Sequence, residues 1–433
     1  MRAASSTAPS RRPIISTIRA ISRTTKNLGL ITALGFSSGL PLVLCGFTLR
    51  MWLTAEHLPL GLIGLTASLG LPYTLKFLWA PIFDEVRPPL LGRRRGWLIC
   101  VQAALIAAIA VLACSNPAHR IGFTLAMGGL VAFLSASQDI LIDAWRIESF
   151  APDAQGAALG GYVWGYRIAM LASGSGVIAL SILTGWRGAY LLMAALALVG
   201  PAATLLAAEP PAVPASGGQA FAARFATAVW APLAEFLSRR GALVIVAFII
   251  SYRLGEALAG VMLAPYYTFL GFNRAQIALA NGPSALAATL AGAAFGGYVV
   301  AKLGVGRALI VATIFQTVVL LLYPALSLAR GHPLMLALLV PVEAFAETFE
   351  YAAFLTYLSG LCDPRFTATQ YALLSSLSPI ALHTIGGVSG YIAQAMGFLP
   401  FFILCTGAAL PAMALMFWIL RFYPPADRRA GVG

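Results

Sequence analysis

The sequence predicts an all-α polytopic membrane protein with twelve transmembrane helices in two pseudo-symmetric six-helix halves. Hydrophobic residues make up 60% of the 433 residues, charged residues only 10%, and the mean hydropathy is +0.85. Soluble domains carry about 25% charged residues, so this composition belongs in lipid. The net charge of +13 does not indicate nucleic-acid binding, because the basic residues lie between apolar runs and not on one soluble face.

Twelve spans result when the bilayer thickness, about 20 helical residues, is used as the ruler for the apolar runs. Their centres lie near Pro41, Pro72, Ile106, Val131, Ala169, Leu196, Ala257, Ala288, Thr317, Glu347, Pro379 and Leu410. Connections are mostly short, but residues 209–241 open with a Pro-, Ser- and Gly-rich linker composition. We expect a cytoplasmic basic tail (1–27), an N-terminal half (28–208), a cytoplasmic linker (209–241), a C-terminal half (242–422) and a cytoplasmic tail (423–433).

The Lys and Arg residues predict the orientation, because cytoplasmic loops carry an excess of both. With both termini in the cytoplasm, twenty basic residues lie inside, and only four lie outside: Arg120, Arg187, Arg274 and Arg330. The polar first 26 residues and the long apolar run that follows do not read as a cleavable signal peptide. We therefore expect a multi-pass protein with both termini cytoplasmic.

The two halves repeat one another weakly. Arg93 opens the third span nine residues before Gln102, and Arg307 opens the ninth span nine residues before Gln316. The acidic stretches of the fourth and tenth spans also occupy similar places in their halves. Parallel six-helix halves joined by a cytoplasmic linker resemble the layout of the major facilitator superfamily.

The fourth span carries Asp139, Asp143 and Arg146, four and three residues apart and hence on one helical face. A charge at the membrane centre costs about 2.5–3.5 kcal/mol, so such residues persist where they face protein or a water-filled passage. Two interpretations stay open. Arg146 could neutralise both carboxylates as a structural latch, or the face could couple protons or gate; a latch that breaks in one state is itself a gate.

The tenth span carries Glu343, Glu347 and Glu350, again on one predicted face. Three carboxylates in a low dielectric cannot all stay ionised without cations, so we expect at least one to hold a proton near neutral pH. An exchangeable proton in a membrane cavity is what a proton-coupled carrier requires. The alternative is that Arg167 or Arg253 pairs with these glutamates permanently.

Candidate substrate-binding residues come from two Tyr-Arg pairs inside apolar spans and from neighbouring polar residues. Because a guanidinium forks onto carboxylate or phosphate, both arginines are candidates for binding an anionic group. The predicted set is Arg167, Arg253, Glu256, Tyr166, Tyr252 and Gln138. Glu256 lies one turn from Arg253 and could be its resting partner.

The loop after the second span places an acid before a basic cluster. Asp84, Arg93, Arg94 and Arg95 could clamp two helices at the cytoplasmic face as a gate. The positive-inside rule explains part of the same pattern.

Catalytic and metal-binding motifs are missing. The sequence has no phosphate-binding loop, no Gly-x-Ser-x-Gly elbow and no metal-spaced His/Cys set, so we expect no enzyme activity, cofactor or metal. The five cysteines are scattered in apolar context without paired spacing. Of the four histidines, only His383 lies deep in a span, where it could relay protons or be a satisfied core residue.

Several motifs resemble those of the AmpG-type permeases of the bacterial inner membrane, nearly end to end. They are residues 34–41 (LGFSSGLP), 76–81 (KFLWAP), 92–97 (GRRRGW), 135–145 (SASQDILIDAW), 165–167 (GYR), 252–257 (YRLGEA) and 366–378 (FTATQYALLSSLS). The resemblance implies proton-driven import of anhydro-muropeptides for cell-wall recycling, with protons and the lipid bilayer as further partners. It also implies polar roles for Asp139, Asp143, Arg167, Glu343 and the Arg253/Glu256 pair.

Two departures from the family keep alternatives open. Glu347 and Glu350 stand where such permeases usually have small residues, and three carboxylates would suit a cationic or metal-chelating ligand, such as a siderophore. A membrane-embedded acyltransferase would show covalent turnover by the purified protein. A channel would show uptake indifferent to the proton gradient. We expect a secondary transporter with its cavity between the two halves.

Overall fold

The computed structural model describes residues 14–89, 91–151, 154–210, 231–328, 332–362 and 367–422, and every element it assigns there is helical. The first half comprises α1 (Ile14–Cys45), α2 (Phe47–Ala55), α3 (Leu60–Leu65), η1 (Thr66–Gly70), α4 (Leu71–Leu75), η2 (Lys76–Leu78), α5 (Ile82–Glu85), α6 (Arg93–Ala113), α7 (Ile121–Ser149), α8 (Gln155–Leu171), the π-helix η4 (Ala172–Gly176), α9 (Val177–Leu196) and α10 (Val199–Leu206).

The second half follows a short helix, α12 (Ala231–Ser238), which lies within the predicted linker. It comprises α13 (Ala242–Ser251), α14 (Leu254–Phe269), α15 (Arg274–Ala280), α16 (Pro283–Leu303), α17 (Val305–Leu320), α18 (Leu322–Leu328), α19 (Pro333–Leu361), α20 (Thr367–Thr384), η6 (Ile385–Val388), α21 (Ser389–Met396) and α22 (Phe398–Phe422). Residues 211–230 of the predicted linker and the tail 423–433 lie outside the described residues.

Nine helical segments of the described chain are long and apolar enough to cross a membrane. One of them, Gln155–Leu206, covers two predicted spans and breaks at Gly185, where φ is 67° and ψ 171°. The tenth and eleventh predicted spans correspond to α19 and to α20 with α21. Each of the twelve predicted centres lies within a helix, so the structure is consistent with the predicted number of spans.

Each half is a bundle held by close backbone approach. In the first half α1 packs against α7, α8 and α10; in the second, α19 packs against α16 and α17. A Cβ at Gly35 would collide with the carbonyl oxygen of Tyr162, and one at Gly292 with that of Phe345. Because lipid gives helices little hydrophobic reason to associate, small residues that admit van der Waals contact between backbones supply much of the attraction.

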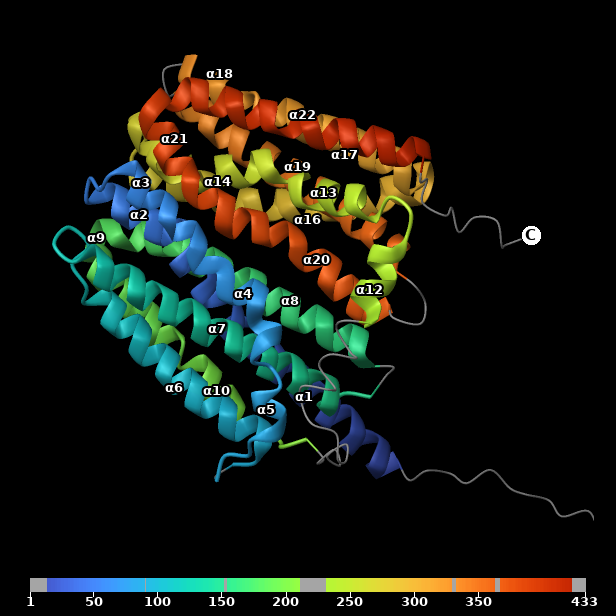
Figure 1. Cartoon of the computed structure of the whole chain (residues 1–433). Helices are drawn as coiled ribbons and strands as arrows, with labels where there is room; N and C mark the ends of the chain where they lie inside the picture. Colours follow the sequence, from blue (N-terminus) through green and yellow to red (C-terminus); the bar gives the residue numbers. More distant parts are fainter. Residues whose placement is uncertain are drawn as a thin grey trace, which may run out of the picture.

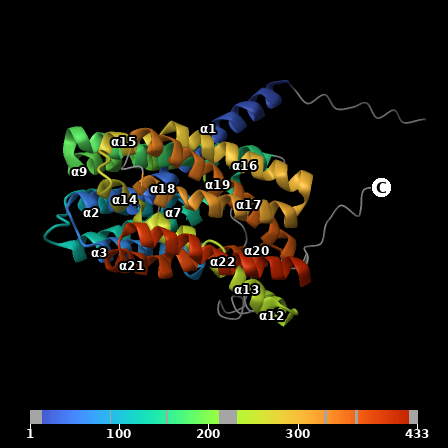
Figure 2. The ribbon, with the colours of Figure 1, turned by 90° about the horizontal axis from the view of Figure 1, so that it is seen from above.

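The two halves meet mainly at one end of the molecule. There α3 packs against α21, α2 against α14, and α9 against α15, as Figures 1 and 2 show. Gly64 lies against the backbone of Gly390, and the Ser175 hydroxyl donates to the carbonyl oxygen of Asn281 at 2.5 Å. The halves diverge toward the other end, where α1 begins and α22 ends (Figure 1).

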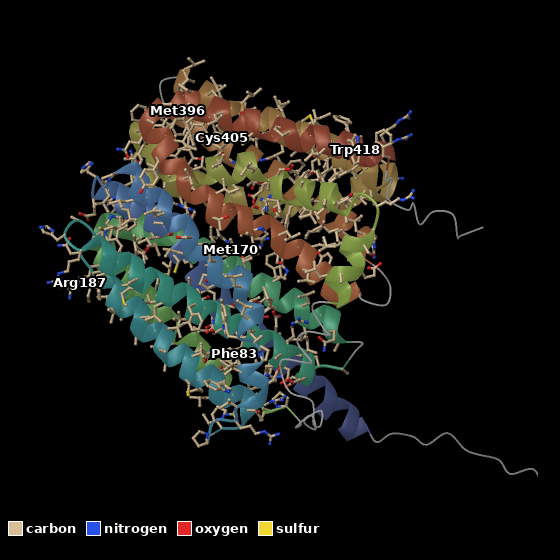
Figure 3. The ribbon with its side chains drawn as sticks, in the orientation of Figure 1. Phe83, Met170, Arg187, Met396, Cys405 and Trp418 are labelled. Carbon is tan, nitrogen blue, oxygen red and sulfur yellow. The ribbon has the colours of Figure 1, made fainter. Side chains whose placement is uncertain are left out.

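The positions of four labelled side chains distinguish the two ends of the molecule. Arg187, which the sequence places outside, and Met396 lie toward the end where the halves meet, whereas Phe83 and Trp418 lie toward the diverging end (Figure 3). The basic cluster that opens α6 also lies at the diverging end, next to α5 (Figure 1).

Several spans break near their middle. The first breaks at Gly46 (φ −96°, ψ −113°), the seventh at Arg253 (φ −105°, ψ 18°), and the eleventh at Thr384 (φ −104°, ψ −63°). Non-helical backbone at membrane depth is tolerated where it lies within protein or lines a water-filled cavity. These breaks therefore indicate where such a cavity lies.

Candidate functional site

A cavity of about 410 Å³ lies between the two halves. The first half contributes α1, α2, η1 and α4, and the second contributes α14, α19 and α20. Most of its lining is apolar, with ionisable groups on both sides. The charged or titratable members of the lining are Cys45, Arg50, Tyr73, Arg253, Glu256, Glu343, Glu347, Tyr351 and His383.

Arg253 is the centre of an ion-pair cluster in this cavity. Its Nη2 donates to Glu256 and, at 2.7 Å, to Oε1 of Glu347, while its Nε donates to Glu256 Oε2 at 2.8 Å. The guanidinium also lies over the ring of Tyr351, 4.9 Å from the centroid. The predicted Arg253–Glu256 pair is thus present, with Glu347 of the tenth span as a second carboxylate that crosses from α19 to α14.

The local backbone explains why the cluster forms there. The seventh span breaks at Tyr252 and Arg253, so Arg253 becomes the N-cap of α14 and Glu256 falls in its first turn. A positive side chain is unfavourable at a helix N-terminus, where the dipole is positive, and a carboxylate in the first turn is favourable. Glu256 therefore stabilises both the helix end and the arginine that caps it.

The glutamates of the tenth span do not share one environment. Glu343 and Glu347 line the cavity, and Glu343 forms no ion pair within the described part of the chain. Glu350 is only 3% exposed and is not among the described residues that line the cavity. Seven residues make nearly two helical turns, so Glu350 lies on the same face of α19 as Glu343. The structure differs from the prediction only in that Glu350 is covered by protein and does not line the cavity described here.

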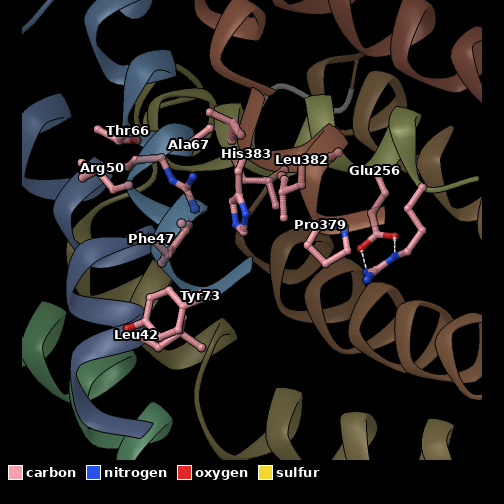
Figure 4. A pocket seen from close by; sticks show the side chains of 18 of the residues that line it. Leu42, Phe47, Arg50, Thr66, Ala67, Tyr73, Glu256, Pro379, Leu382 and His383 are labelled. Atoms are coloured by element: carbon pink, nitrogen blue, oxygen red, sulfur yellow. Dashed lines mark hydrogen bonds and ion pairs between the residues drawn. The ribbon is translucent and has the colours of Figure 1, made fainter. Parts of the chain in front are cut away.

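The opposite side of the cavity carries Arg50, Tyr73 and His383 (Figure 4). The Nδ1 of His383 lies 3.0 Å from the Thr74 hydroxyl, which joins α20 to α4. The Nε of Arg50 and the hydroxyl of Tyr73 are buried and have no hydrogen-bond partner among the described residues. The sequence interpretation did not single out Arg50, although a charged residue within the first apolar run is a signal that could have found it.

Asp139 is buried inside the first half, 6% exposed, and is not among the described cavity-lining residues. It accepts a hydrogen bond from the Ser38 hydroxyl, which also lies 2.9 Å from the hydroxyl of Tyr162. Gln138 is fully buried and donates to the carbonyl oxygen of Ser37 at 2.9 Å. These bonds tie α7 to α1, so Asp139 and Gln138 meet protein and not the described lining of the central cavity.

In the part of the chain that the structure describes, the other two residues of the predicted polar face, Asp143 and Arg146, pair with each other and not with Asp139. Arg146 donates to Asp143 at 3.2 Å and to the amide oxygen of Gln155 at 3.3 Å, and within the described chain it makes no ion pair with Asp139. The interpretation in which Arg146 neutralises both carboxylates is thus wrong for Asp139. Ser38, which the sequence interpretation did not weigh, is the partner that takes that place.

The first Tyr-Arg pair lies away from the cavity. Arg167 donates to the thioether sulfur of Met170 at 3.8 Å and forms no ion pair with the described helix-ten glutamates. Tyr166 packs against α1, where a Cβ at Gly39 would meet it. Tyr252, from the second pair, is 3% exposed and bonds the Thr313 hydroxyl at 2.8 Å inside the second half. The structure therefore brings only Arg253 of the two pairs to the cavity.

The predicted basic cluster at the start of α6 is an ion-pair network. Arg94 pairs with Asp84 at 2.8 Å and with Glu148 at 2.6 Å, and Arg93 pairs with Glu148 at 2.9 Å. Glu209 accepts from the backbone N–H groups of Arg94 and Arg95, at 2.8 and 3.0 Å, and so caps α6. Glu148 and Glu209 are partners of this cluster that the sequence interpretation did not name.

These bonds join α5, α6 and α7 of one half to each other. In this conformation they brace the diverging end of the first half and do not bridge to the second half within the described residues. A clamp of this kind keeps three helices together when the half moves as a unit.

Two helical bundles around an ionisable cavity, with broken helices at its walls, define a membrane transporter of the alternating-access kind. The sequence model of the Major Facilitator Superfamily matches residues 28–381. The chain therefore belongs to the major facilitator superfamily and, within it, to the AmpG-type permeases.

Relatives and solved structures agree with this assignment. The chain is 37% identical over 395 residues to the anhydromuropeptide permease of Escherichia coli K12, covering 89% of this chain and 78% of the relative. It is 32% identical over 396 residues to putative transporter AmpG 4 of Rickettsia felis, covering 90% and 95%. These relatives are permeases and transporters, so the chain is a membrane transporter and not an enzyme.

The fold is similar to that of two solved transporters. The nucleoside transporter NupG has a TM-score of 0.66 and 15% identity, with 92% of this chain and 98% of that chain covered. A bacterial homologue of the lysosomal transporter Spinster, solved inward-facing and unoccupied, has a TM-score of 0.65 and 16% identity, with 92% and 97% covered.

Proposed function

We propose that this protein imports anhydro-muropeptides across a bacterial inner membrane, driven by protons, with both termini in the cytoplasm. The observation that carries the proposal is the cluster of Arg253, Glu256 and Glu347, with Glu343 beside it in the same cavity. The relative named as an anhydromuropeptide permease supports the choice of substrate.

Proton coupling follows from the balance of charge in the cluster. The described cavity lining holds three carboxylates, Glu256, Glu343 and Glu347, and two guanidinium groups, Arg50 and Arg253. In a region of low dielectric this excess of one negative charge is costly, and binding one proton removes it. Release of that proton on the other side of the membrane would restore the excess. The bound proton would therefore favour one conformation of α14 against α19 over the other.

The proposed orientation assigns each end of the molecule to one side of the membrane. In the proposed orientation, the end where α3 meets α21 is periplasmic, and the diverging end is cytoplasmic. The periplasmic path is then closed by the contact of Gly64 with Gly390, and the cavity faces the cytoplasm. We propose that Asp139 and the Asp143–Arg146 pair, on α7, help the first half move as a unit. Arg167 remains a proposed contact for the other conformation.

The test is uptake of a labelled anhydro-muropeptide into proteoliposomes that contain the purified full-length protein. With the outside made acidic, the protein should accumulate substrate above its external concentration, and a protonophore should abolish accumulation. Glu343→Gln should reduce accumulation about tenfold while exchange of substrate across the membrane at equal pH continues. Arg187→Gln, at the closed end, is the matched control and should match the unsubstituted protein.

Two outcomes would overturn the proposal. Uptake that ignores the protonophore would indicate a passive pathway. Full accumulation by Glu343→Gln would remove that residue from proton coupling. In cells, deletion of the gene should release anhydro-muropeptides into the medium; an unchanged medium would count against the substrate.

A second candidate substrate is a siderophore. It is favoured by the excess of carboxylates over arginines in the cavity, which suits a cationic or metal-chelating ligand. Loss of iron uptake alone in the deletion strain, with no muropeptide in the medium, would favour this substrate over the first.

A further inference from the structure

We propose that the Arg50 guanidinium binds a carboxylate of the transported molecule in the central cavity. The identity of that molecule rests on the proposed function, whereas the subsite itself rests on the geometry of the first span and of the cavity wall. The subsite lies on the side of the cavity opposite the Arg253 cluster (Figure 4).

Arg50 lies in α2, four residues after the break at Gly46, and lines the cavity. Its Nε is buried, and the guanidinium forms no ion pair or side-chain hydrogen bond within the described residues. A guanidinium carries five N–H donors and keeps its charge in proteins. Leaving such a group inside a membrane protein without an acceptor is costly, so an acceptor that comes and goes is the simplest reason for it.

The contrast with Arg253 shows which cation is free for a ligand. Both arginines line the same cavity, but Arg253 already donates to Glu256 and Glu347. A ligand carboxylate that approached Arg253 would have to displace a protein carboxylate. At Arg50 it would meet unused donors, and its negative charge would compensate the buried positive one.

One neighbour of Arg50 can add a donor. Tyr73 also lines the cavity, but its hydroxyl is buried and points away from the His383 imidazole (Figure 4). His383 uses Nδ1 toward Thr74, which leaves Nε2 for a ligand. A Cβ at Gly70 would collide with Nε2 of His383, so Gly70 is what gives the imidazole its position. Figure 4 shows this imidazole next to the Arg50 guanidinium.

The charges of the cavity favour a carboxylate over a phosphate. Its described lining holds two arginines and three glutamates, so a dianionic group would add to a negative excess. A single negative charge adds least, and its two oxygens match one face of the guanidinium fork. The class of ligand is therefore a molecule with a free carboxylate, such as the peptide stem of a muropeptide.

The test measures binding to purified protein in lipid nanodiscs for two pairs of probes. One pair is an anhydro-muramyl tripeptide and the same molecule with its carboxylates amidated. The other is N-acetyl-D-alanyl-D-alanine and its amide. The unsubstituted protein should bind each acid about tenfold or more tightly than its amide. Arg50→Gln should bind acid and amide alike, Arg50→Lys should show an intermediate preference, and Arg187→Gln should keep the full preference.

A second measurement separates binding from a structural role. Without ligand, Arg50→Gln should unfold at the same temperature as the unsubstituted protein or higher, because it removes an uncompensated charge. A lower unfolding temperature together with equal weakening for acid and amide would make Arg50 structural and overturn the proposal. So would an acid preference that survives in Arg50→Gln.

The outcomes also distinguish this proposal from the proposed function. If the protein binds neither muropeptide but prefers the small acid to its amide through Arg50, the substrate is wrong and the subsite stands. If it binds both forms of the muropeptide equally, the substrate stands and the subsite is wrong.

Discussion

The two halves of this transporter hold their buried carboxylates by different means. In the first half Asp139 accepts from the neutral hydroxyl of Ser38 and forms no ion pair within the described residues. In the second half Glu256 and Glu347 share the charge of Arg253. A hydroxyl group can hydrogen-bond to a carboxyl group whether that group is ionised or protonated, whereas an arginine stabilises only the ionised form. If the protein is proton-coupled as we propose, the contacts that change with protonation are therefore expected in the second half.

The largest effect should come from breaking the charged arrangement. Arg253→Gln leaves Glu256 and Glu347 without their cation, and loss of one partner of a buried pair costs about 3–5 kcal/mol. Since Arg253 and Glu347 are 22% and 41% exposed, we expect about 3 kcal/mol or less, together with loss of uptake. Unfolding in nanodiscs and uptake in proteoliposomes measure the two effects. The double variant Arg253→Gln with Glu347→Gln should recover part of the stability; no recovery would mean that the pair is not coupled.

Removing the Ser38 hydroxyl in the first half should reduce stability by a smaller amount. Ser38→Ala removes the hydrogen bond to Asp139 and leaves a buried carboxyl with one partner fewer, which costs about 1–2 kcal/mol. Ser359→Ala is a matched control, because that exposed hydroxyl donates to the carbonyl oxygen of Leu355 in its own helix and belongs to the other half of the molecule. Equal unfolding temperatures for the two variants would show that Asp139 does not depend on Ser38.

The smallest effect should come from the exposed pair of the first half. Asp143→Asn removes the bond to Arg146, and Asp143 is 41% exposed. Pairs one helical turn apart contribute about 0.3–0.5 kcal/mol, so stability and uptake should both stay close to those of the unsubstituted protein. A severe loss of uptake with normal folding would instead give this pair a role in the other conformation.

The spans could be predicted because bilayer thickness fixes their length, and each predicted centre lies in a helix. The breaks at Gly46 and Arg253 could not, since nothing local requires them and the stabilising partners come from other helices. Many glycines in this sequence would permit a helix break, but only a few of them lie at one in the described part of the chain.

The candidate site residues that could be predicted also depended on local spacing, and those that could not depended on other helices. The Arg253–Glu256 pair was predictable because its members lie one turn apart on one helix. The direction of Arg167 was not, because helical spacing gives the face of a residue but not which neighbour covers that face. Arg50 was passed over because a single charge in an apolar run has no companion in sequence; its companions Tyr73 and His383 come from two other spans.

The glycine contact at the closed end has a consequence for the speed of the transport cycle. At Gly64 and Gly390 the two halves touch through bare main chain, and a methyl group at Gly64 would already lie 2.8 Å from the amide nitrogen of Gly390. The two backbones can part at Gly64 without a change of side-chain rotamer, whereas one turn away the Tyr391 ring and the Gln394 side chain pack on Gly61. A methyl group at Gly64 would hold the two backbones apart, so this end would close incompletely and the cycle would slow.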